Sequence, residues 1–196
     1  SSKFFNRSLA LYEGLGRELN FNVMLSQRGK VSLAHSPHEL EVMRRTVNAI
    51  RMNGVDSEIV TPRELAKLEP TLNFNARYPI EGAAVQWRGG IARHDAVVWA
   101  FARAAGALGV DIVQGCEVTG IAVVNGRVRG VETTRGAVAS PRVLIAVAGH
   151  SSVLAAKAGL KLPIQSMALQ AMVTEPVKPL INTVLVSAAI HVYVSQ

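Results

Sequence analysis

Cysteine is almost absent from the sequence: Cys116 is the only one among 196 residues. A single cysteine cannot form a disulfide within the chain, which excludes the disulfide-stapled secreted domains and favours a reducing compartment. A chain of this length can bury roughly two-thirds of its unfolded surface, so a hydrophobic core alone is enough to stabilise it. We therefore expect one folded domain, or one and a half, located in the cytoplasm.

Long hydrophobic runs are also lacking. The longest uninterrupted apolar stretch, VLIAVAG at 143–149, has the length of a buried strand and is too short to span a bilayer. The first residues, SSKFFNRSLALYEGLGREL, carry charges through their middle and no small-residue cleavage site, unlike a signal peptide. The sequence therefore predicts neither a membrane span nor a secretory leader.

Acidic residues are few: 14 Asp and Glu stand against 21 Lys and Arg, which gives a formal charge of +7 and a pI near 10.1. The basic residues are scattered, with Arg44-Arg45 as their only adjacent pair, and no aromatic side chains interleave with them. A solvated basic surface, or a face for an acidic partner, is therefore favoured over nucleic-acid binding. The charged fraction of 18% and the mean hydropathy of +0.24 indicate that another component covers part of the apolar surface.

A glycine-rich dinucleotide fingerprint is missing as well. The nearest approach, Gly14-Leu15-Gly16, lies inside an expected helix and has Leu19 where a third glycine belongs. The stretch His35-Ser36-Pro37-His38-Glu39 contains metal-ligand residue types, but its spacing matches no zinc-binding helix and its proline places it at a helix start. We expect a solvated turn there and no metal site, and spacing alone selects no Ser/His/Asp triad.

Apolar periodicity and capping residues predict the helices. Thr61-Pro62-Arg63-Glu64 is a capping box with proline at the first helical position, so a short helix follows it. The apolar stripe of the helix after His94 is expected to contain Val97, Val98, Phe101, Ala105 and Leu108. The expected helices are 3–19, Pro37 to a stop at Asn53-Gly54, Thr61 to Glu69, His94 to Gly109, and one that starts near Ser151-Ser152.

Alternating and apolar runs predict the strands. NVMLSQ (22–27) and KVSLAHS (30–36) are separated by Arg28-Gly29, which indicates a hairpin. In the second half, Asn125-Gly126 is typical of a two-residue hairpin turn within a three-stranded meander. The other expected strands are 58–61, 83–87, 110–114, 116–124, 127–134, one after Arg135-Gly136, 143–147, 168–176, 183–187 and 191–196. The order is mixed α and β, with a β-rich C-terminal half.

One candidate binding site is the turn Gly149-His150-Ser151-Ser152. A strand that enters a helix through glycine offers free backbone N–H groups and a positive helix end to an anionic ligand. A plain strand–helix connection explains the same residues and is favoured on this pattern alone.

A second candidate is His94, between Arg93 and Asp95, where a Gly-Gly loop becomes an apolar helix. On spacing alone the favoured interpretation is a half-exposed histidine next to Asp95 as the helix cap. The alternative is a nucleophile, because a neutral imidazole can attack an electrophilic carbon while Arg93 and Arg88 stabilise an anion that develops on the partner.

A longer pattern surrounds His94. The run RYPIEGAAVQWRGGIARHDAVVWAFARAAGALGVDI (77–112), in which ARHDAVVWAFA is the most specific motif, resembles the β subunits of heterotetrameric sarcosine oxidases. The resemblance covers essentially the whole chain in order, through SQRG, LAHS, NGVDSEIV, GCEVTGI, TTRG, AGHSSVLA, GLKLPIQS, LQAMVTEP and HVYVSQ. By this resemblance the chain is identified as a member of the FAD-dependent flavoproteins of the D-amino-acid-oxidase type.

The resemblance implies the oxidation of a secondary N-methyl amine. In that family, noncovalent FAD in the β subunit takes the N-methyl hydride of sarcosine. Electrons then pass to an FMN at the interface with the α subunit, where oxygen becomes hydrogen peroxide. The α subunit carries NAD and handles the tetrahydrofolate that captures the one-carbon unit. The implied partners are the α subunit and a small N-methyl amine, with no nucleic acid and no membrane.

The resemblance also assigns roles near the FMN and the substrate. His94 corresponds to the histidine that is joined to FMN through the 8α-methyl carbon of the flavin, and Arg93 is its neighbouring cation. His191 and Tyr193 are candidates for the substrate side, because the strand that they occupy is expected to face the cavity.

The FAD contacts implied by the resemblance lie further along the chain. Val118 matches the position whose backbone meets the adenine side of FAD. Ala148, Gly149 and His150 match the stretch that passes its diphosphate and ribose.

The chain departs from the family pattern at both ends. It lacks the N-terminal strand with the glycine-rich FAD fingerprint and the C-terminal glycine-rich segment that cradles the isoalloxazine ring, and its last run, HVYVSQ, stops without a turn or cap. We therefore expect a central fragment that is inactive by itself, binds no FAD and carries little or no covalent FMN. Met167-Ala168 stands where relatives tend to carry His-Pro, which leaves the local strand geometry open.

The expected fold class is mixed α/β or α+β: a substrate-side mixed sheet with helices, plus part of an FAD-binding domain. Residues 1–109 are expected to form the helical substrate-side segment with the FMN tether, 110–160 a remnant of the FAD-binding domain, and 161–196 the returning strands of the substrate domain. Two alternatives stay open. One is a single-flavin amine oxidase or dehydrogenase of the same superfamily with His94 untethered, and the other is a basic nucleic-acid or assembly module.

Overall fold

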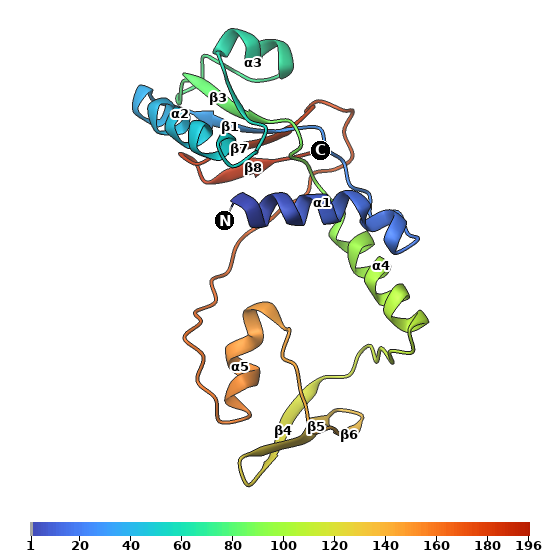
Figure 1. Ribbon diagram of the computed structural model, residues 1–196. Helices are drawn as coiled ribbons and strands as arrows, with labels where there is room; N and C mark the ends of the chain where they lie inside the picture. Colours follow the sequence, from blue (N-terminus) through green and yellow to red (C-terminus); the bar gives the residue numbers. More distant parts are fainter. Residues whose placement is uncertain (1) are drawn as a thin grey trace. The chain divides into compact units, whose positions relative to one another are not determined.

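The computed structural model describes residues 2–196, which divide into two compact units. The first unit comprises the chain up to Val110 together with Glu175–Gln196, and the second comprises Asp111–Thr174. The first carries a five-stranded sheet and the second a three-stranded sheet (Figure 1). The chain is therefore mixed α and β, as the sequence predicts, while the functional division into three segments stays a prediction.

The sheet of the first unit has the strand order β2-β3-β1-β7-β8. The pair β1 and β7 is parallel, and the other neighbouring strands run antiparallel, so the sheet is mixed. The strands from the far end of the chain thus join the strands from its beginning. Their bounds are β1 Lys30–Ala34, β2 Glu58–Val60, β3 Gly82–Gln86, β7 Val184–Ser187 and β8 Val192–Val194.

The helices of this unit are α1 Ser2–Glu18, α2 Pro37–Arg51, α3 Pro62–Leu68 and α4 His94–Ala107. The predicted capping box is confirmed, because the Thr61 hydroxyl accepts the N–H of Glu64 while the Glu64 carboxylate accepts the N–H of Thr61. Ser36 caps α2 by accepting the N–H of Glu39. No helix within residues 2–196 is long and apolar enough to cross a membrane.

The main hydrophobic core lies on one face of this sheet. Val31 of β1 stands opposite Val85 of β3 on one side and Leu185 of β7 on the other. Leu65 of α3 packs into the same buried cluster. Directly paired residues on neighbouring strands point to the same face, so one row of β-branched and aliphatic side chains joins three strands.

The predicted hairpin of 22–27 with 30–36 is wrong. β1 pairs with β3 and β7 instead, and the earlier segment contributes a single bridge, between Ser26 and Ile91. Both edges of β1 are occupied by strands that bring apolar partners to Val31, and Met24 has a φ of 53°, which interrupts the extended run. The long-range pairing therefore prevails over the local one.

The second unit contains the predicted three-stranded meander, which is confirmed as β4 Val118–Val124, β5 Arg127–Thr133 and β6 Gly136–Ala139. Asn125 and Gly126 have φ values of 52° and 72°, as a type I′ hairpin turn requires. The 3₁₀ turn η1 Ala148–His150 and the helix α5 Ser151–Ala156 follow.

Three further strand predictions, 110–114, 143–147 and 168–176, are wrong. These segments carry apolar side chains, but no neighbouring strand pairs with them within residues 2–196. Leu144 and Leu169 are 90% and 93% exposed. A strand needs hydrogen-bond partners as well as an apolar run, so the run alone is insufficient.

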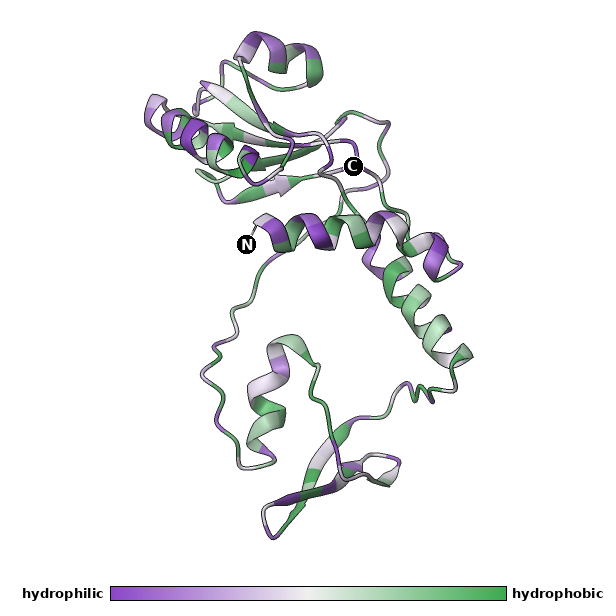
Figure 2. Cartoon of the chain, viewed as in Figure 1, coloured by the Kyte–Doolittle hydropathy of each residue, from purple (hydrophilic) through white to green (hydrophobic). Residues whose placement is uncertain are grey.

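The predicted apolar stripe of α4 is wrong in part, because Val97 packs against a small core while other members of the stripe are exposed. Ala96 and Ala100 are the buried residues, whereas Val98, Phe101 and Leu108 are exposed by 62%, 51% and 86%. Ala100 packs with Leu15 and Val23 in a second small core. The helix is hydrophobic along much of its length (Figure 2), yet its larger side chains face outward from this contact.

A buried carboxylate joins α3 to the start of β7. Glu69, the C-terminal cap residue of α3, is fully buried and accepts the backbone N–H groups of Asn182 at 3.1 Å and Thr183 at 2.6 Å. From the sequence alone, Glu69 is expected only at a helix end. Its contribution depends on residues more than a hundred positions away, which the local sequence does not reveal.

Replacing Glu69 by alanine should destabilise the first unit. The substitution leaves the buried N–H of Thr183 without an acceptor, which costs about 1–3 kcal/mol of unfolding free energy. Glu41→Gln is the control, because Glu41 forms an exposed ion pair with Arg45 that is worth about 0.5 kcal/mol or less. Urea unfolding followed by circular dichroism measures both, and equal losses would contradict the assigned role.

Candidate functional site

His94 is the first residue of α4, and its side chain is exposed. Arg93, rather than Asp95, occupies the N-cap position, and its side chain makes no capping hydrogen bond. The expectation that Asp95 is the cap is therefore wrong. Asp95 lies inside the first turn, where its carboxylate accepts the N–H of Ala96 at 2.9 Å.

Arg93 and Asp95 form an ion pair that spans His94. The Arg93 Nη2 lies 2.7 Å from Oδ2 of Asp95, and its Nε donates to Oδ1 at 3.1 Å. These hydrogen bonds from Arg93, with a smaller contribution from the N–H of Ala96, lower the pKa of Asp95 to about 2. The carboxylate correspondingly raises the pKa of Arg93. At neutral pH the charge of Arg93 is thus compensated within the same turn.

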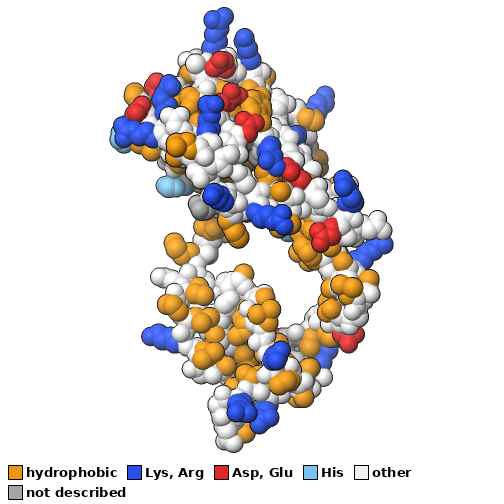
Figure 3. Space-filling model, viewed as in Figure 1, with side chains coloured by type: hydrophobic (Ala, Val, Ile, Leu, Met, Phe, Trp, Pro, Cys, Tyr) orange, Lys and Arg blue, Asp and Glu red, His pale blue; other side chains and the backbone are white. Residues whose placement is uncertain are grey.

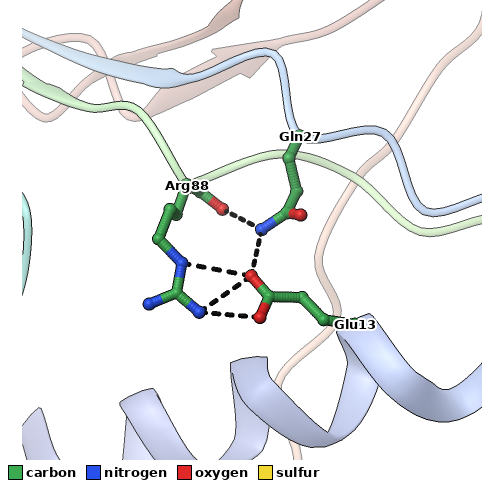
Figure 4. Close-up of polar contacts among 3 residues, drawn as sticks. All are labelled: Glu13, Gln27 and Arg88. Atoms are coloured by element: carbon green, nitrogen blue, oxygen red, sulfur yellow. Dashed lines mark hydrogen bonds and ion pairs between the residues drawn. The ribbon is translucent and has the colours of Figure 1, made fainter.

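Arg88, the other expected cation, is also paired (Figure 4). Its guanidinium donates to the Glu13 carboxylate at 2.7 Å, 2.8 Å and 3.1 Å. The side-chain amide of Gln27 donates to Glu13 and to the backbone carbonyl of Arg88, each at 2.9 Å. The Arg88 and Gln27 bonds lower the pKa of Glu13. The sequence indicated Arg88 but not Glu13. The two residues are 75 positions apart, and only the tertiary structure brings α1 next to Arg88.

The loop 88–92 that leads to His94 lies against residues 26–29. Ser26 and Ile91 exchange backbone hydrogen bonds at 2.8 Å and 3.0 Å, and Gly29 donates to the carbonyl of Gly89 at 2.9 Å. A Cβ atom on Gly90 would overlap the carbonyl oxygen of Ser26, so this close approach requires glycine. The Gly-Gly pair is thus needed for packing between the two segments.

A cavity of about 600 Å³ adjoins this loop. Its walls include Phe5, Leu9 and Tyr12 of α1, the loop residues Gly89 to Ala92, and the polar side chains of Gln27 and Lys30. The volume falls in the range of small-molecule sites, and the mixture of apolar walls with few polar groups is typical of them.

The four predicted FAD-contact residues all lie in the second unit. Val118 begins β4 and pairs with Thr133. Ala148, Gly149 and His150 form η1 and are exposed, and Ala148 has a φ of 46°. Because residues 143–147 form no strand, the predicted strand-to-helix turn is a 3₁₀ turn that runs into α5.

Serine hydroxyls hold the backbone of this turn. Ser166 Oγ donates to the carbonyl of Gly149 at 2.5 Å, and Ser151 Oγ donates to the carbonyl of Ala148 at 2.7 Å. Lys157, just after α5, donates to the carbonyl of Thr119 at 2.8 Å. That bond connects the end of α5 to the beginning of β4. The helix that follows residues 148–150 is thus held next to the strand that contains Val118.

His191 and Tyr193 belong to the last strand pair of the first unit. His191 precedes β8 with a φ of 50°, and Tyr193 pairs with Val186 and is 68% exposed. Both residues are exposed and neither lines the cavity beside the 88–92 loop, so their place on the substrate side stays a prediction.

His35 was expected in a solvated turn, but it is half-buried and partnered. Its Nδ1 lies 3.0 Å from the carbonyl oxygen of Pro79, and its Nε2 lies 2.8 Å from the Ser187 hydroxyl. A carbonyl can only accept, so Nδ1 carries a hydrogen, while the Ser187 hydroxyl can either donate or accept. The bond to Ser187 joins the end of β1 to β7, which explains why the sequence alone did not reveal it. Within residues 2–196 there is no group of three or more His, Cys, Asp and Glu side chains that could hold a metal ion.

Basic side chains are distributed over the visible face of the molecule rather than gathered in a stripe (Figure 3). On the first unit, acidic and apolar side chains lie between them on that face.

Comparisons with known proteins point to one family. The model of the family described as FAD dependent oxidoreductase matches residues 1–196. A sarcosine oxidase subunit beta from Rhodobacter capsulatus is 49% identical over 197 residues, covering all of this chain and 48% of the relative. The corresponding subunits from Rhizobium meliloti and an Arthrobacter species are 49% and 48% identical, with 47% and 49% of the relative covered. The chain thus spans about half the length of these curated relatives.

Solved structures share the fold. An L-proline dehydrogenase from P. horikoshii has a TM-score of 0.83 at 23% identity and covers 99% of this chain and 52% of its own. A glycine oxidase from Geobacillus kaustophilus has a TM-score of 0.75 at 23% identity, with 93% of this chain and 49% of its own covered. At these identities the likeness concerns the fold.

Removing Arg93 should raise the pKa of Asp95 from about 2 toward its ordinary value of 3.8. Because the folded-state pKa is the lower one, this carboxylate stabilises the fold above pH 3.8, and the contribution is lost as the pH falls through about 2. NMR titration of the Asp95 carboxyl carbon in Arg93→Leu measures the shift. Arg103→Leu, on the same helix, is the control, and an unchanged pKa in Arg93→Leu would contradict the pairing.

Proposed function

Because the chain belongs to the family of FAD-dependent oxidoreductases, we propose that it is a segment of the β subunit of a sarcosine oxidase. The observation that carries this proposal is the 49% identity to such subunits, continuous over the whole chain. The intact protein would oxidise the N-methyl group of sarcosine or a similar secondary amine. The cytoplasmic location expected from the sequence stays a prediction.

FAD, when bound, supplies the acceptor for the hydride of the N-methyl group. We assign Val118 and the turn of Ala148, Gly149 and His150 to its binding. The turn is exposed, and a Cβ on Gly149 would meet only Ser166, at 3.7 Å or more, so a ligand can approach the backbone closely on the remaining sides. The residues present therefore leave room for an extended cofactor such as FAD.

His94 is proposed as the attachment point of FMN. Its imidazole is exposed at the beginning of α4, next to the loop that borders the 600 Å³ cavity. His94 would hold FMN through a bond from an imidazole nitrogen to the 8α-methyl carbon of the flavin. That bond would replace the imidazole N–H and one methyl C–H, and oxygen would be the oxidant that takes up the two hydrogens as hydrogen peroxide. Arg93, held by Asp95, is the nearest cation in sequence.

Substrate binding is assigned to the side of the sheet where β8 lies, with His191 and Tyr193 as contact residues. Their exposure supports this placement, because a substrate-contacting side chain must be reachable. An imidazole and a phenol hydroxyl can both hydrogen-bond to a carboxylate, which an N-methyl amino acid carries.

The partner is proposed to be an α subunit that carries NAD and handles tetrahydrofolate. The outward side of α4 supports a protein contact near His94: Val98, Trp99 and Phe101 are exposed by 62%, 60% and 51%. Exposed apolar side chains grouped on one element are typical of surfaces that another protein covers.

The experiment that tests this function is a search for flavin on the peptide that contains His94. The full-length protein, co-expressed with its partner subunit, is precipitated with acid and digested, and the peptides are analysed by mass spectrometry. We expect a flavin-mass adduct on His94 in the wild type and none in His94→Ala, because the attachment needs the imidazole nitrogen at that position.

The matched control is His38→Ala, which removes an exposed histidine of α2 and should leave the adduct intact. An unmodified His94 peptide from an active, yellow enzyme would favour a single-flavin oxidase or dehydrogenase instead. D-amino acid dehydrogenases are among the relatives, one of them 31% identical over 138 residues, which gives that second candidate its basis.

A further inference from the structure

We propose that Gln27 is a positioning residue for His94: its side-chain amide holds the loop 88–92 in place and thereby sets where the first turn of α4 begins. The inference rests on the proposed attachment of flavin to His94. It adds a residue that lies 67 positions earlier in the chain and bonds to the loop that precedes α4. Two layers of hydrogen bonds connect the segment around Gln27 to the loop.

Backbone bonds form the first layer of this contact. Ser26 and Ile91 bond to each other in both directions, and Gly29 donates to the carbonyl of Gly89. Gly29 also accepts the N–H of Val184, the first residue of β7, at 2.9 Å. The loop is therefore connected through residues 26–29 to β1 and β7, the central strands of the sheet.

Gln27 supplies the second layer (Figure 4). A carboxamide nitrogen carries two hydrogens, and here one is donated to the Arg88 carbonyl and the other to the Glu13 carboxylate. The same carboxylate binds the Arg88 guanidinium. Both the backbone and the side chain of Arg88 are thus held, one by Gln27 directly and the other through Glu13.

The contact with Gln27 adds to the support that the first turn of α4 has from the Arg93–Asp95 ion pair and from the hydrogen bond of the Ala96 N–H to Asp95. Arg93 caps the helix without a side-chain hydrogen bond, and the nearest buried side chain is Ala96. Bond formation to an imidazole requires the reacting atoms to be brought to about 3–3.5 Å, and a misplacement of about 1 Å can cost roughly a hundredfold in rate. A loop fixed at Arg88 and Ile91 reduces the freedom of the residues that follow it.

The test compares Gln27→Leu and Gln27→Glu in the full-length complex with its partner subunit. Glutamate has the same shape as glutamine but no hydrogen to donate, and its charge repels Glu13. We expect covalently bound flavin, measured as the flavin that stays with acid-precipitated protein, to fall about tenfold in both variants, as the loss of a well-placed hydrogen bond predicts. The melting temperature should change by only about 2–4 °C, because the contact is exposed.

A double variant separates the two bonds. In Glu13→Gln with Gln27→Glu, residue 27 can pair with Arg88 and residue 13 can donate to residue 27, but the Arg88 carbonyl still has no donor. We expect the double variant to remain deficient in covalent flavin. Glu41→Gln, in an exposed ion pair on α2, is the control and should retain the wild-type amount.

The outcomes are distinguishable. Wild-type flavin content in both Gln27 variants, or recovery in the double variant, would overturn the positioning role and leave the proposed function intact. A wild-type enzyme whose His94 carries no flavin would overturn the proposed function and this inference together. A loss of flavin that is matched by general unfolding in every variant would assign Gln27 a structural role and overturn the proposal.

Discussion

The first unit depends on the position of β1 between β3 and β7. Val31 meets Val85 on one side and Leu185 on the other, so a single strand joins segments that lie about fifty and about one hundred and fifty residues further along the chain. Closing so long a loop costs entropy only slowly with length, and buried apolar contacts and paired backbone groups offset that cost. Glu69 adds to this closure, since its carboxylate binds the N–H groups at the start of β7.

The candidate site is organised from this sheet outward. Gly29, immediately before β1, bonds to β7 on one side and to the 88–92 loop on the other, so the loop and the strand share one backbone contact. His94, the proposed site residue, thereby follows a loop that the sheet supports, an arrangement common to binding and catalytic sites. The two glycines on this path, Gly89 and Gly90, allow backbone segments to approach closely.

Charge near His94 is compensated locally. Arg93 pairs with Asp95 and Arg88 pairs with Glu13, so the two cations that the sequence places next to the histidine do not act as free positive charges. Exposed ion pairs of this kind contribute little to the free energy of unfolding, so their main effect here is to hold the two side chains in one orientation. The chain as a whole is basic, but near His94 each of these two arginines has a carboxylate partner.

The sequence by itself determined the elements whose signals are local. The Thr61 capping box, the Asn125-Gly126 turn with its meander and the helices α1 and α2 follow from neighbouring residues, because caps, turns and periodicity act over only a few positions. The motif around His94 is likewise a local signal, and it was enough to indicate the family.

Only the tertiary structure decided which runs become strands: VLIAV and the 168–176 segment stay unpaired, while KVSLA pairs with two distant strands. It likewise decided that Ala100 rather than Phe101 is buried, and that Glu13 and Gln27 hold Arg88. These outcomes depend on contacts between residues far apart in the chain, and no local pattern encodes them.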